Sequence, residues 1–335
     1  MGLFDKIKEP IFLKETSSAE KQLKDLQKLY HQVDSKHKSQ IEKDIKLLET
    51  GIIGEKQIEF ELKNSHMPMI VLHDLYFEKD GFSAQIDYLV VTRGINFVLE
   101  CKNLFGNIEI DNSGNFIRTF TYGKTKVKEG IYSPITQNQR HLEVIRLLRG
   151  DTKNFIEKAS FDSSFSKIYR SVVVLANPKT VLNAKYARKE IREQVIRADQ
   201  LISYIKKANH ENEFGISSEK VMLNLGQFFL DCHKDNPQDY FIKYRNAVTE
   251  TKVTEELNNI ISINDVINQN KCPKCGSDMI KRKATKGANI GKEFFGCSKF
   301  PKCRSTLNID VAKKVQNKAQ SKHRDVLDDG VNSDY

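Results

Sequence analysis

The stretch QIDYLVVTRGINFVLECK, residues 85–102, constrains the fold more than any other part of the sequence. Two apolar runs, residues 86–91 and 95–99, flank the short polar link Thr92-Arg93-Gly94, and this pattern predicts a β-hairpin. Successive positions of each run are apolar, so both faces of each strand need to be buried. We therefore expect the hairpin to lie inside a sheet that is covered on both sides.

Three charged side chains, Asp87, Glu100 and Lys102, interrupt this apolar stretch. If Arg93 and Gly94 form a two-residue loop, the ladder places Asp87 opposite Glu100, with side chains about 5 Å apart. A three-residue loop would shift this pairing by one. Buried, opposed carboxylates need a cation, and a divalent metal ion that prefers oxygen ligands is the natural candidate. The alternative is an ordinary salt bridge between Glu100 and Lys102 at a strand end.

Helical patterns precede the hairpin. Apolar residues spaced by three and four between residues 18 and 50 predict two amphipathic helices, broken near residues 34–36. Gly51 and Gly54 end this pattern, and Glu55 is expected to begin a further short helix. The first two helices either pack on the core or form an arm for homo-oligomerisation or partner docking.

Alternating strands and helices follow. Strands are expected at residues 69–77, 106–111, 116–122 and 169–176. Ser133 as N-cap and Pro134 at the first helical position predict a helix to about residue 148, with Gln137 in its first turns. Further helical patterns occupy residues 185–195, 199–207 and 218–233. Together these elements predict an α/β fold with a mixed sheet flanked by helices.

Composition limits the environment and the partners. The chain has 335 residues and a formal net charge of +10, which favours a polyanionic partner. The N-terminus lacks the apolar core of a signal peptide, and no apolar run approaches the roughly 18 residues of a membrane span. We therefore expect a cytoplasmic protein with no membrane partner, in which Cys101 and Cys232 are buried thiols.

The other four cysteines form two closely spaced pairs near the C-terminus. Cys272 and Cys275 belong to CPKC, and Cys297 and Cys303 to GCSKFPKC. Four thiolates at this separation predict a structural, tetrahedral zinc site. A disulfide or redox pair is the alternative, which a reducing compartment disfavours.

Basic and aromatic residues surround these cysteines. Such a mixture suits single-stranded nucleic acid, because rings stack on bases and cations follow the phosphates. Phe294 or Phe295 is expected to pack in the ribbon core instead. The expected nucleic-acid contacts are Lys281, Arg282, Lys283, Lys286, Lys292, Lys299, Phe300 and Arg304.

Five separated segments resemble the nuclease-related domain family, NERD, of the PD-(D/E)XK nuclease superfamily. They are GIIGE at 51–55, QIDYLVV at 85–91, Gly94, LECKN at 99–103 and PITQN at 134–138. The resemblance implies a restriction-endonuclease-like fold and a metal-dependent phosphodiester hydrolase, with DNA favoured over RNA as partner. The alternative is a non-catalytic nucleic-acid-binding protein that uses the nuclease fold as a scaffold.

The same resemblance implies roles for five polar residues. Asp87 and Glu100 would hold Mg²⁺ or Mn²⁺, and Glu55 would complete the metal shell. Lys102 would orient a water molecule or stabilise charge on the reacting phosphate, and Gln137 would position the lysine or a phosphate.

The cysteine segment, through FFGCSKFPKCR at 294–304, resembles the C-terminal zinc ribbons of bacterial type I DNA topoisomerases. We therefore expect N-terminal helices at 1–50, the nuclease-related core at 51–180 and a helical extension and connector at 181–265. The zinc ribbon is expected at 266–310, followed by a disordered polar tail at 311–335.

Overall fold

The computed structural model describes residues 7–33, 35–213, 215–238, 240–244, 271–286 and 289–308. Those up to Ile242, apart from Gln32 and Val33, form one compact unit, and those from residue 271 onward belong to a second. The predicted tail and most of the predicted connector, residues 245–265, lie outside the described residues.

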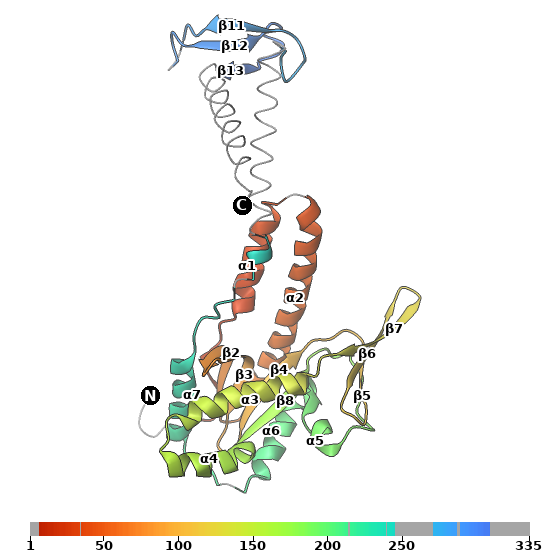
Figure 1. Cartoon of the computed structure of the whole chain (residues 1–335), viewed down its shortest axis with the longest axis vertical. Helices are drawn as coiled ribbons and strands as arrows, with labels where there is room; N and C mark the ends of the chain where they lie inside the picture. The colour runs from red at the N-terminus through yellow and green to blue at the C-terminus, as the bar shows by residue number, and fades with distance from the viewer. Residues whose placement is uncertain are drawn as a thin grey trace, which may run out of the picture. The chain divides into compact units, whose positions relative to one another are not determined.

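A six-stranded mixed sheet forms the centre of the first unit (Figure 1). Its strand order is β1-β2-β3-β4-β8-β10. The pairs β1–β2, β4–β8 and β8–β10 are parallel, whereas β2–β3 and β3–β4 are antiparallel. The strands are β1 (Ile11–Lys14), β2 (Ile70–Lys79), β3 (Phe82–Val91), β4 (Asn96–Lys102), β8 (Tyr169–Leu175) and β10 (Val195–Arg197).

Helices cover both faces of this sheet, which explains why its central strands are apolar at successive positions. On one face, α2 (Ser35–Lys63) and α6 (Leu201–His210) share a core with Val90 and Phe97. On the other face, α3 (Pro134–Gly150) and α7 (Glu219–Cys232) pack over Leu89 and Val98, with α4 (Phe155–Ile168) beside them. The predicted α/β architecture is confirmed. None of the described helices is both long and apolar enough to cross a membrane.

A four-stranded sheet, ordered β7-β6-β5-β9, is inserted mainly between β4 and α3. It contains β5 (Asn107–Ile110), β6 (Phe116–Tyr122), β7 (Thr125–Ile131) and β9 (Leu182–Asn183). The strands expected near β5 and β6 are confirmed. The sequence did not predict β7, because its residues TKVKEGI are largely exposed and lack the apolar signal of a buried strand.

The predicted helix break at Gly51 and Gly54 is wrong, because α2 continues through both residues. It packs with α1 (Ser18–Tyr30) and follows it after a short break near residue 34. A Cβ atom at Gly54 would lie 2.6 Å from Cβ of Asn103 and 3.1 Å from Sγ of Cys101. Gly54 is therefore a site of close approach between α2 and the end of β4, not a helix terminus.

The two glycines make a matched pair for testing this contact. Gly54→Ala should destabilise the protein by about 1–3 kcal/mol, because the new methyl group overpacks the contact. Gly51→Ala should stabilise it by up to about 1 kcal/mol, because a Cβ there meets nothing within 4 Å and alanine favours helix. Chemical denaturation of both variants measures the difference. Equal changes in the free energy of unfolding of the two variants would contradict the close approach at Gly54.

Two other helical predictions have different outcomes. Ser133 caps α3 as predicted, with the Thr136 N–H donating to its Oγ at 3.4 Å. The helix expected at residues 185–195 is largely wrong, since α5 (Lys189–Arg192) has only four residues. Val195 instead begins β10 and pairs with Val173, because its apolar side chain completes the core beside β8.

Candidate functional site

The β3–β4 hairpin has the register predicted from a two-residue loop. The Thr92 N–H donates to the Ile95 carbonyl at 3.3 Å, which leaves Arg93 and Gly94 as the loop. The ladder then pairs Val91 with Asn96 and continues to Tyr88 with Leu99. The next position on the two strands brings Asp87 opposite Glu100. The two carboxylates are therefore neighbours across the end of the ladder.

The sheet is irregular at Asp87. Pairing of β2 with β3 passes from His73–Tyr88 to Leu75–Ile86 and skips Asp74 and Asp87. Asp74 has a φ of 54°, a left-handed conformation that interrupts a strand. The Asp87 carboxylate accepts a 2.6 Å hydrogen bond from the Cys101 N–H. This bond fixes Asp87 at the end of β4, beside Glu100.

Lys102 connects Glu100 to α3. Its Nζ donates to Oε1 of Glu100 at 2.6 Å and to Oε1 of Gln137 at 3.2 Å. The Glu100 side chain is 2% exposed and that of Lys102 is 27% exposed, so the ammonium lies at the mouth of a buried acidic site. Gln137 holds Lys102 from the first turns of α3.

The second oxygen of Glu100 has no hydrogen-bond partner among the described residues, although it is buried. Nδ1 of His141, equally buried and unpartnered, lies 3.6 Å from it. Burial, together with the positive charge of Lys102, lowers the pKa of His141 to about 4, so the ring is neutral at pH 7. A buried carboxylate oxygen that accepts no hydrogen bond can be stabilised by a bound cation or water molecule.

Glu55 reaches the same region from α2. Its Oε2 lies 3.0 Å from Nε2 of His73, which stacks on Tyr88 with ring centroids 4.4 Å apart. The Tyr88 hydroxyl donates to the Glu55 carbonyl at 2.9 Å. Burial disfavours a charged His73, but the hydrogen bond and charge of Glu55 raise its pKa overall. His73 and Tyr88 thus hold the Glu55 segment against the sheet.

The electrostatics of the site favour an added cation. Burial, followed by the charges of Glu100 and Glu55, raises the pKa of Asp87 well above its usual value. Burial also raises the pKa of Glu100, even though Lys102 opposes this. Asp87 and Glu100 therefore share one ammonium group, with the charge of Glu55 nearby, in a poorly solvated site. A divalent ion would supply the missing charge, and carboxylate oxygens are the ligands that Mg²⁺ and Mn²⁺ prefer.

The structure brings all five predicted residues to one region, but it does not gather Glu55, Asp87 and Glu100 into a tight ligand cluster. Among the described residues, the four ribbon cysteines form the only group of three or more His, Cys, Asp or Glu residues whose ligand atoms lie within 4.8 Å of one another. His73 and His141 were not predicted from the sequence. His141 had a usable signal, because it lies one turn after Gln137 on the same helix face.

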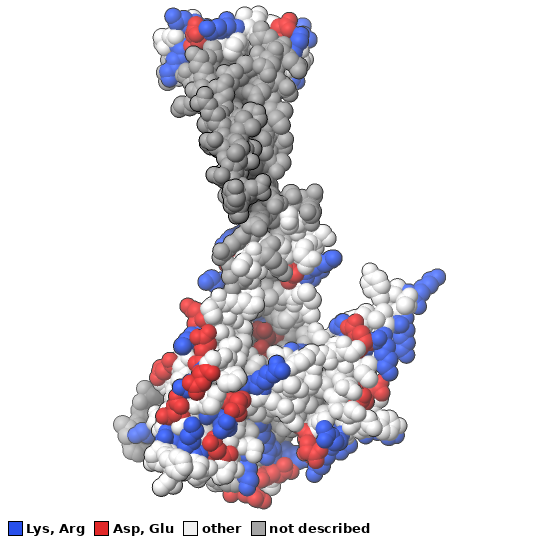
Figure 2. Space-filling model, in the orientation of Figure 1, with Lys and Arg blue, Asp and Glu red and all other residues white. Residues whose placement is uncertain are grey.

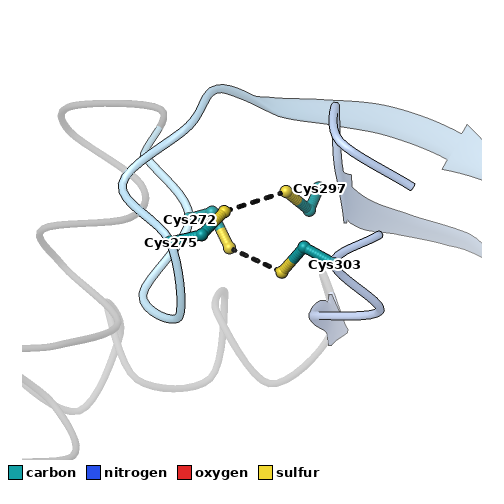
Figure 3. Close-up of side chains that lie close together, drawn as sticks. All are labelled: Cys272, Cys275, Cys297 and Cys303. Carbon is teal, nitrogen blue, oxygen red and sulfur yellow. Dashed lines mark hydrogen bonds between the residues drawn. The ribbon is translucent and has the colours of Figure 1, made fainter. Parts of the chain in front are cut away.

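The second unit contains a three-stranded antiparallel sheet of β11 (Met279–Lys283), β12 (Glu293–Cys297) and β13 (Thr306–Asn308). Figure 3 shows the four cysteines converging beside it, from the loop before β11, the end of β12 and the loop before β13. Sulfur atoms of Cys275 and Cys297 are 3.4 Å apart, and those of Cys272 and Cys303 are 3.8 Å apart.

These separations suit a structural zinc site. Zn–S bonds of about 2.3 Å in a tetrahedron place the sulfur atoms about 3.8 Å apart, whereas a disulfide bond measures about 2.05 Å. All four thiols are free. The predicted zinc ribbon is therefore supported over the disulfide alternative.

The ribbon surface carries the predicted basic residues. Phe295 packs against the cysteine core, as expected for one of the two adjacent phenylalanines. Phe300 is 58% exposed, and the Arg282 guanidinium lies 5.8 Å from its ring centre. Lys281 is paired with Glu293 at 2.7 Å. The exposed members of the predicted set are Lys281, Lys283, Lys286, Lys292, Lys299, Phe300 and Arg304.

These features define an α/β domain with a buried acidic site and a lysine, together with a four-cysteine ribbon. Comparison with protein families agrees. Residues 50–176 match the nuclease-related domain, and residues 269–311 match the topoisomerase DNA binding C4 zinc finger. Both resemblances found in the sequence are confirmed.

Curated relatives match only short parts of the chain. DNA topoisomerase 1 of Methanothermobacter thermautotrophicus is 55% identical over 40 residues, which are 12% of this chain and 5% of the relative. DNA topoisomerase 1 of Archaeoglobus fulgidus is 27% identical over 75 residues, which are 22% of this chain and 10% of the relative. The chain thus spans a tenth or less of these relatives' length. No solved structure matches it significantly.

Proposed function

We propose that this protein is a Mg²⁺- or Mn²⁺-dependent nuclease that hydrolyses phosphodiester bonds in DNA. The observation that carries the proposal is the buried Glu100 carboxylate, with one oxygen bound to Lys102 and the other without a donor, opposite Asp87. The nuclease-related domain match supports the same chemistry. The ribbon matches a topoisomerase DNA binding zinc finger, and the curated relatives of the chain are DNA topoisomerases by name, which favours DNA over RNA.

Asp87 and Glu100 would hold the metal ion, with Glu55 completing its shell from α2. Such an ion, when bound, polarises the scissile phosphate and lowers the pKa of a bound water molecule. The Cys101 N–H keeps Asp87 in place, and His73 does the same for Glu55. Hydrogen bonds of this kind orient metal ligands before the metal arrives.

Lys102 would act on the reacting phosphate. Its ammonium, steadied by Gln137, lies at the mouth of the site, where it can stabilise negative charge that develops during cleavage or orient the attacking water. The zinc ribbon would hold nucleic acid through its exposed basic residues. That binding should weaken steeply with salt, because each phosphate contact releases counterions.

A cleavage assay on defined single- and double-stranded DNA, with and without Mg²⁺, tests the proposal. We expect Mg²⁺-dependent cleavage by the parent protein and at least about a hundredfold less by Lys102→Ala. Equal cleavage by the two proteins would show that a contaminant acts. Metal-independent binding without any cleavage would support the alternative, a nucleic-acid-binding protein that uses the nuclease fold as a scaffold.

His141 provides a separate prediction about the metal site. His141→Ala should lower the affinity for Mn²⁺ about 10- to 100-fold, because the cavity left by the buried ring, whose Nδ1 lies 3.6 Å from the free oxygen of Glu100, lets that carboxylate reorient. His141→Asn, which keeps a polar atom on the side chain, should retain more of the affinity. Titration calorimetry measures binding, and thermal unfolding reports stability. Equal Mn²⁺ affinity in parent and His141→Ala protein would mean that His141 serves packing alone.

A further inference from the structure

The hairpin of β6 and β7 projects beyond the sheet that carries it (Figure 1). β5 pairs with β6 only as far as Thr119, whereas β6 and β7 remain paired to Tyr122 and Thr125. We call residues 120–127 the hairpin arm. Phe120, at the base of the arm, packs on Phe105 with ring centroids 6.2 Å apart. At about 3.4 Å per residue, the arm extends about 10 Å from Phe120 to its turn.

The two faces of the hairpin differ in chemistry. Side chains of a strand alternate between faces, so Thr121 and its partner Lys126 share one face with Lys128. Phe120 and Tyr122 lie on the other face, which also carries Arg118, whose guanidinium is 4.8 Å from the Phe120 ring centre. Tyr122 is 79% exposed.

The positive charge of the arm is available for binding. Lys124 and Lys126 are exposed and form no ion pair with any residue that the structure describes. Lys128, just below the arm, reaches Glu109 only at 3.5 Å. In Figure 2, Lys and Arg side chains stand out along this projection.

The hairpin is attached to the candidate nuclease site at both ends. The segment that starts the inserted sheet leaves β4 directly after Lys102. The segment that ends it leads from Ile131 into α3, whose first turns carry Gln137. Lys102 and Gln137 are themselves joined by the 3.2 Å hydrogen bond. The segments at the base of the hairpin therefore carry two residues of the acidic site.

We propose that the hairpin arm inserts into the major groove of duplex DNA and holds that duplex at the nuclease site. The inference rests on the proposed function and names its substrate as duplex DNA. The major groove admits a two-stranded ribbon and is about 8.5 Å deep, close to the arm's length. In the groove, the hairpin face that carries Lys126 and Lys128 meets phosphates. The opposite face, which carries Phe120 and Tyr122, rests against the groove wall.

Other ligands fit less well. The major groove of duplex RNA is too narrow for side chains to read. Single strands are bound in grooves that track the backbone, not by a projecting ribbon. A protein partner of the arm would have to be acidic, and it would leave DNA affinity independent of these lysines.

Affinity measurements on the full chain test the proposal. The test variant is Lys124→Gln/Lys126→Gln/Lys128→Gln, and the matched control is Lys206→Gln/Lys207→Gln/Lys220→Gln, three exposed lysines elsewhere in the same unit. Binding to a 20-base-pair duplex is measured without added Mg²⁺ or Mn²⁺ and without a chelator, so that cleavage does not contribute and the ribbon keeps its zinc. We expect the test variant to bind the duplex at least about tenfold more weakly than the parent. The slope of log affinity against log salt concentration should become shallower by about three, whereas the control should match the parent in both quantities.

Lysine acetylation adds a readout at single residues. Duplex DNA should protect Lys124, Lys126 and Lys128 from acetylation in the parent protein and leave Lys206 and Lys207 reactive. Unchanged affinity of the test variant together with equal acetylation would overturn the proposal and leave the arm to a protein partner. Tighter, arm-dependent binding of single strands or duplex RNA would also overturn it.

The two proposals fail in different ways. A protein that binds duplex DNA through the arm but cleaves nothing contradicts only the proposed nuclease function. A protein that cleaves duplex DNA while the test variant binds like the parent contradicts only the role of the arm.

Discussion

Asp87→Asn should reduce Mg²⁺-dependent DNA cleavage by at least about a hundredfold, since a lost metal ligand removes several kcal/mol of transition-state stabilisation. The same variant should be more stable than the parent when metal is absent. The amide keeps an oxygen that can accept the Cys101 N–H, but it removes a buried negative charge next to Glu100 and Glu55. Cleavage rate and melting temperature therefore move in opposite directions.

The pH dependence follows from the raised pKa of Asp87. Because its folded-state pKa exceeds the unfolded value, the folded protein binds more protons than the unfolded chain between those two values. Stability of the metal-free parent should fall as pH rises through that window. The Asp87→Asn variant should show a flatter profile, which thermal unfolding between about pH 4 and pH 8 would measure.

Asp80→Asn is a matched control, because Asp80 is an exposed residue in the β2–β3 turn whose φ of 51° asparagine tolerates. It should cleave DNA and unfold like the parent. Added Mn²⁺ should raise the melting temperature of the parent and of Asp80→Asn, but not of Asp87→Asn. Cleavage by Asp87→Asn at the parent rate would contradict the assigned site, as would an equal Mn²⁺ effect on its stability.

Zinc removal should unfold the ribbon. Structural zinc sites contribute about 10–16 kcal/mol of apparent binding free energy in small ribbon- and finger-like peptides. The ribbon's described hydrophobic core contains only four buried side chains, three of them cysteines, with Phe295 packed against them. Cys297→Ser should therefore lower the zinc content and make residues 271–308 sensitive to protease, which elemental analysis and limited proteolysis would show.

The first unit should survive this change. Cys297 belongs to the second unit, so the melting of the α/β domain should be unaltered. Cys232→Ser, a change in α7 of the first unit, is the control and should keep the full zinc content. A Cys297→Ser protein that retains stoichiometric zinc would contradict the assigned ligand set.

Several features could be predicted because they depend on residues close together in the chain. The alternation of side chains along the strands and the length of the loop set the β3–β4 register, which places Asp87 opposite Glu100. Ser133 and Pro134 determine the start of α3, and hence the position of Gln137. The spacing of the cysteines determined the zinc ribbon in the same way.

Only the tertiary structure decided the rest. Whether Gly54 ends a helix depends on the space left beside Asn103 and Cys101, which no local pattern encodes. His73 and His141 acquire their places from packing of α2 and α3 on opposite faces of the sheet, because each side chain meets its carboxylate partner only there. The β7 strand of the hairpin arm was missed because its residues are largely polar and exposed, and only its pairing with β6 shows that it is a strand. Burial and long-range contacts, not local spacing, therefore shaped the surroundings of the acidic site.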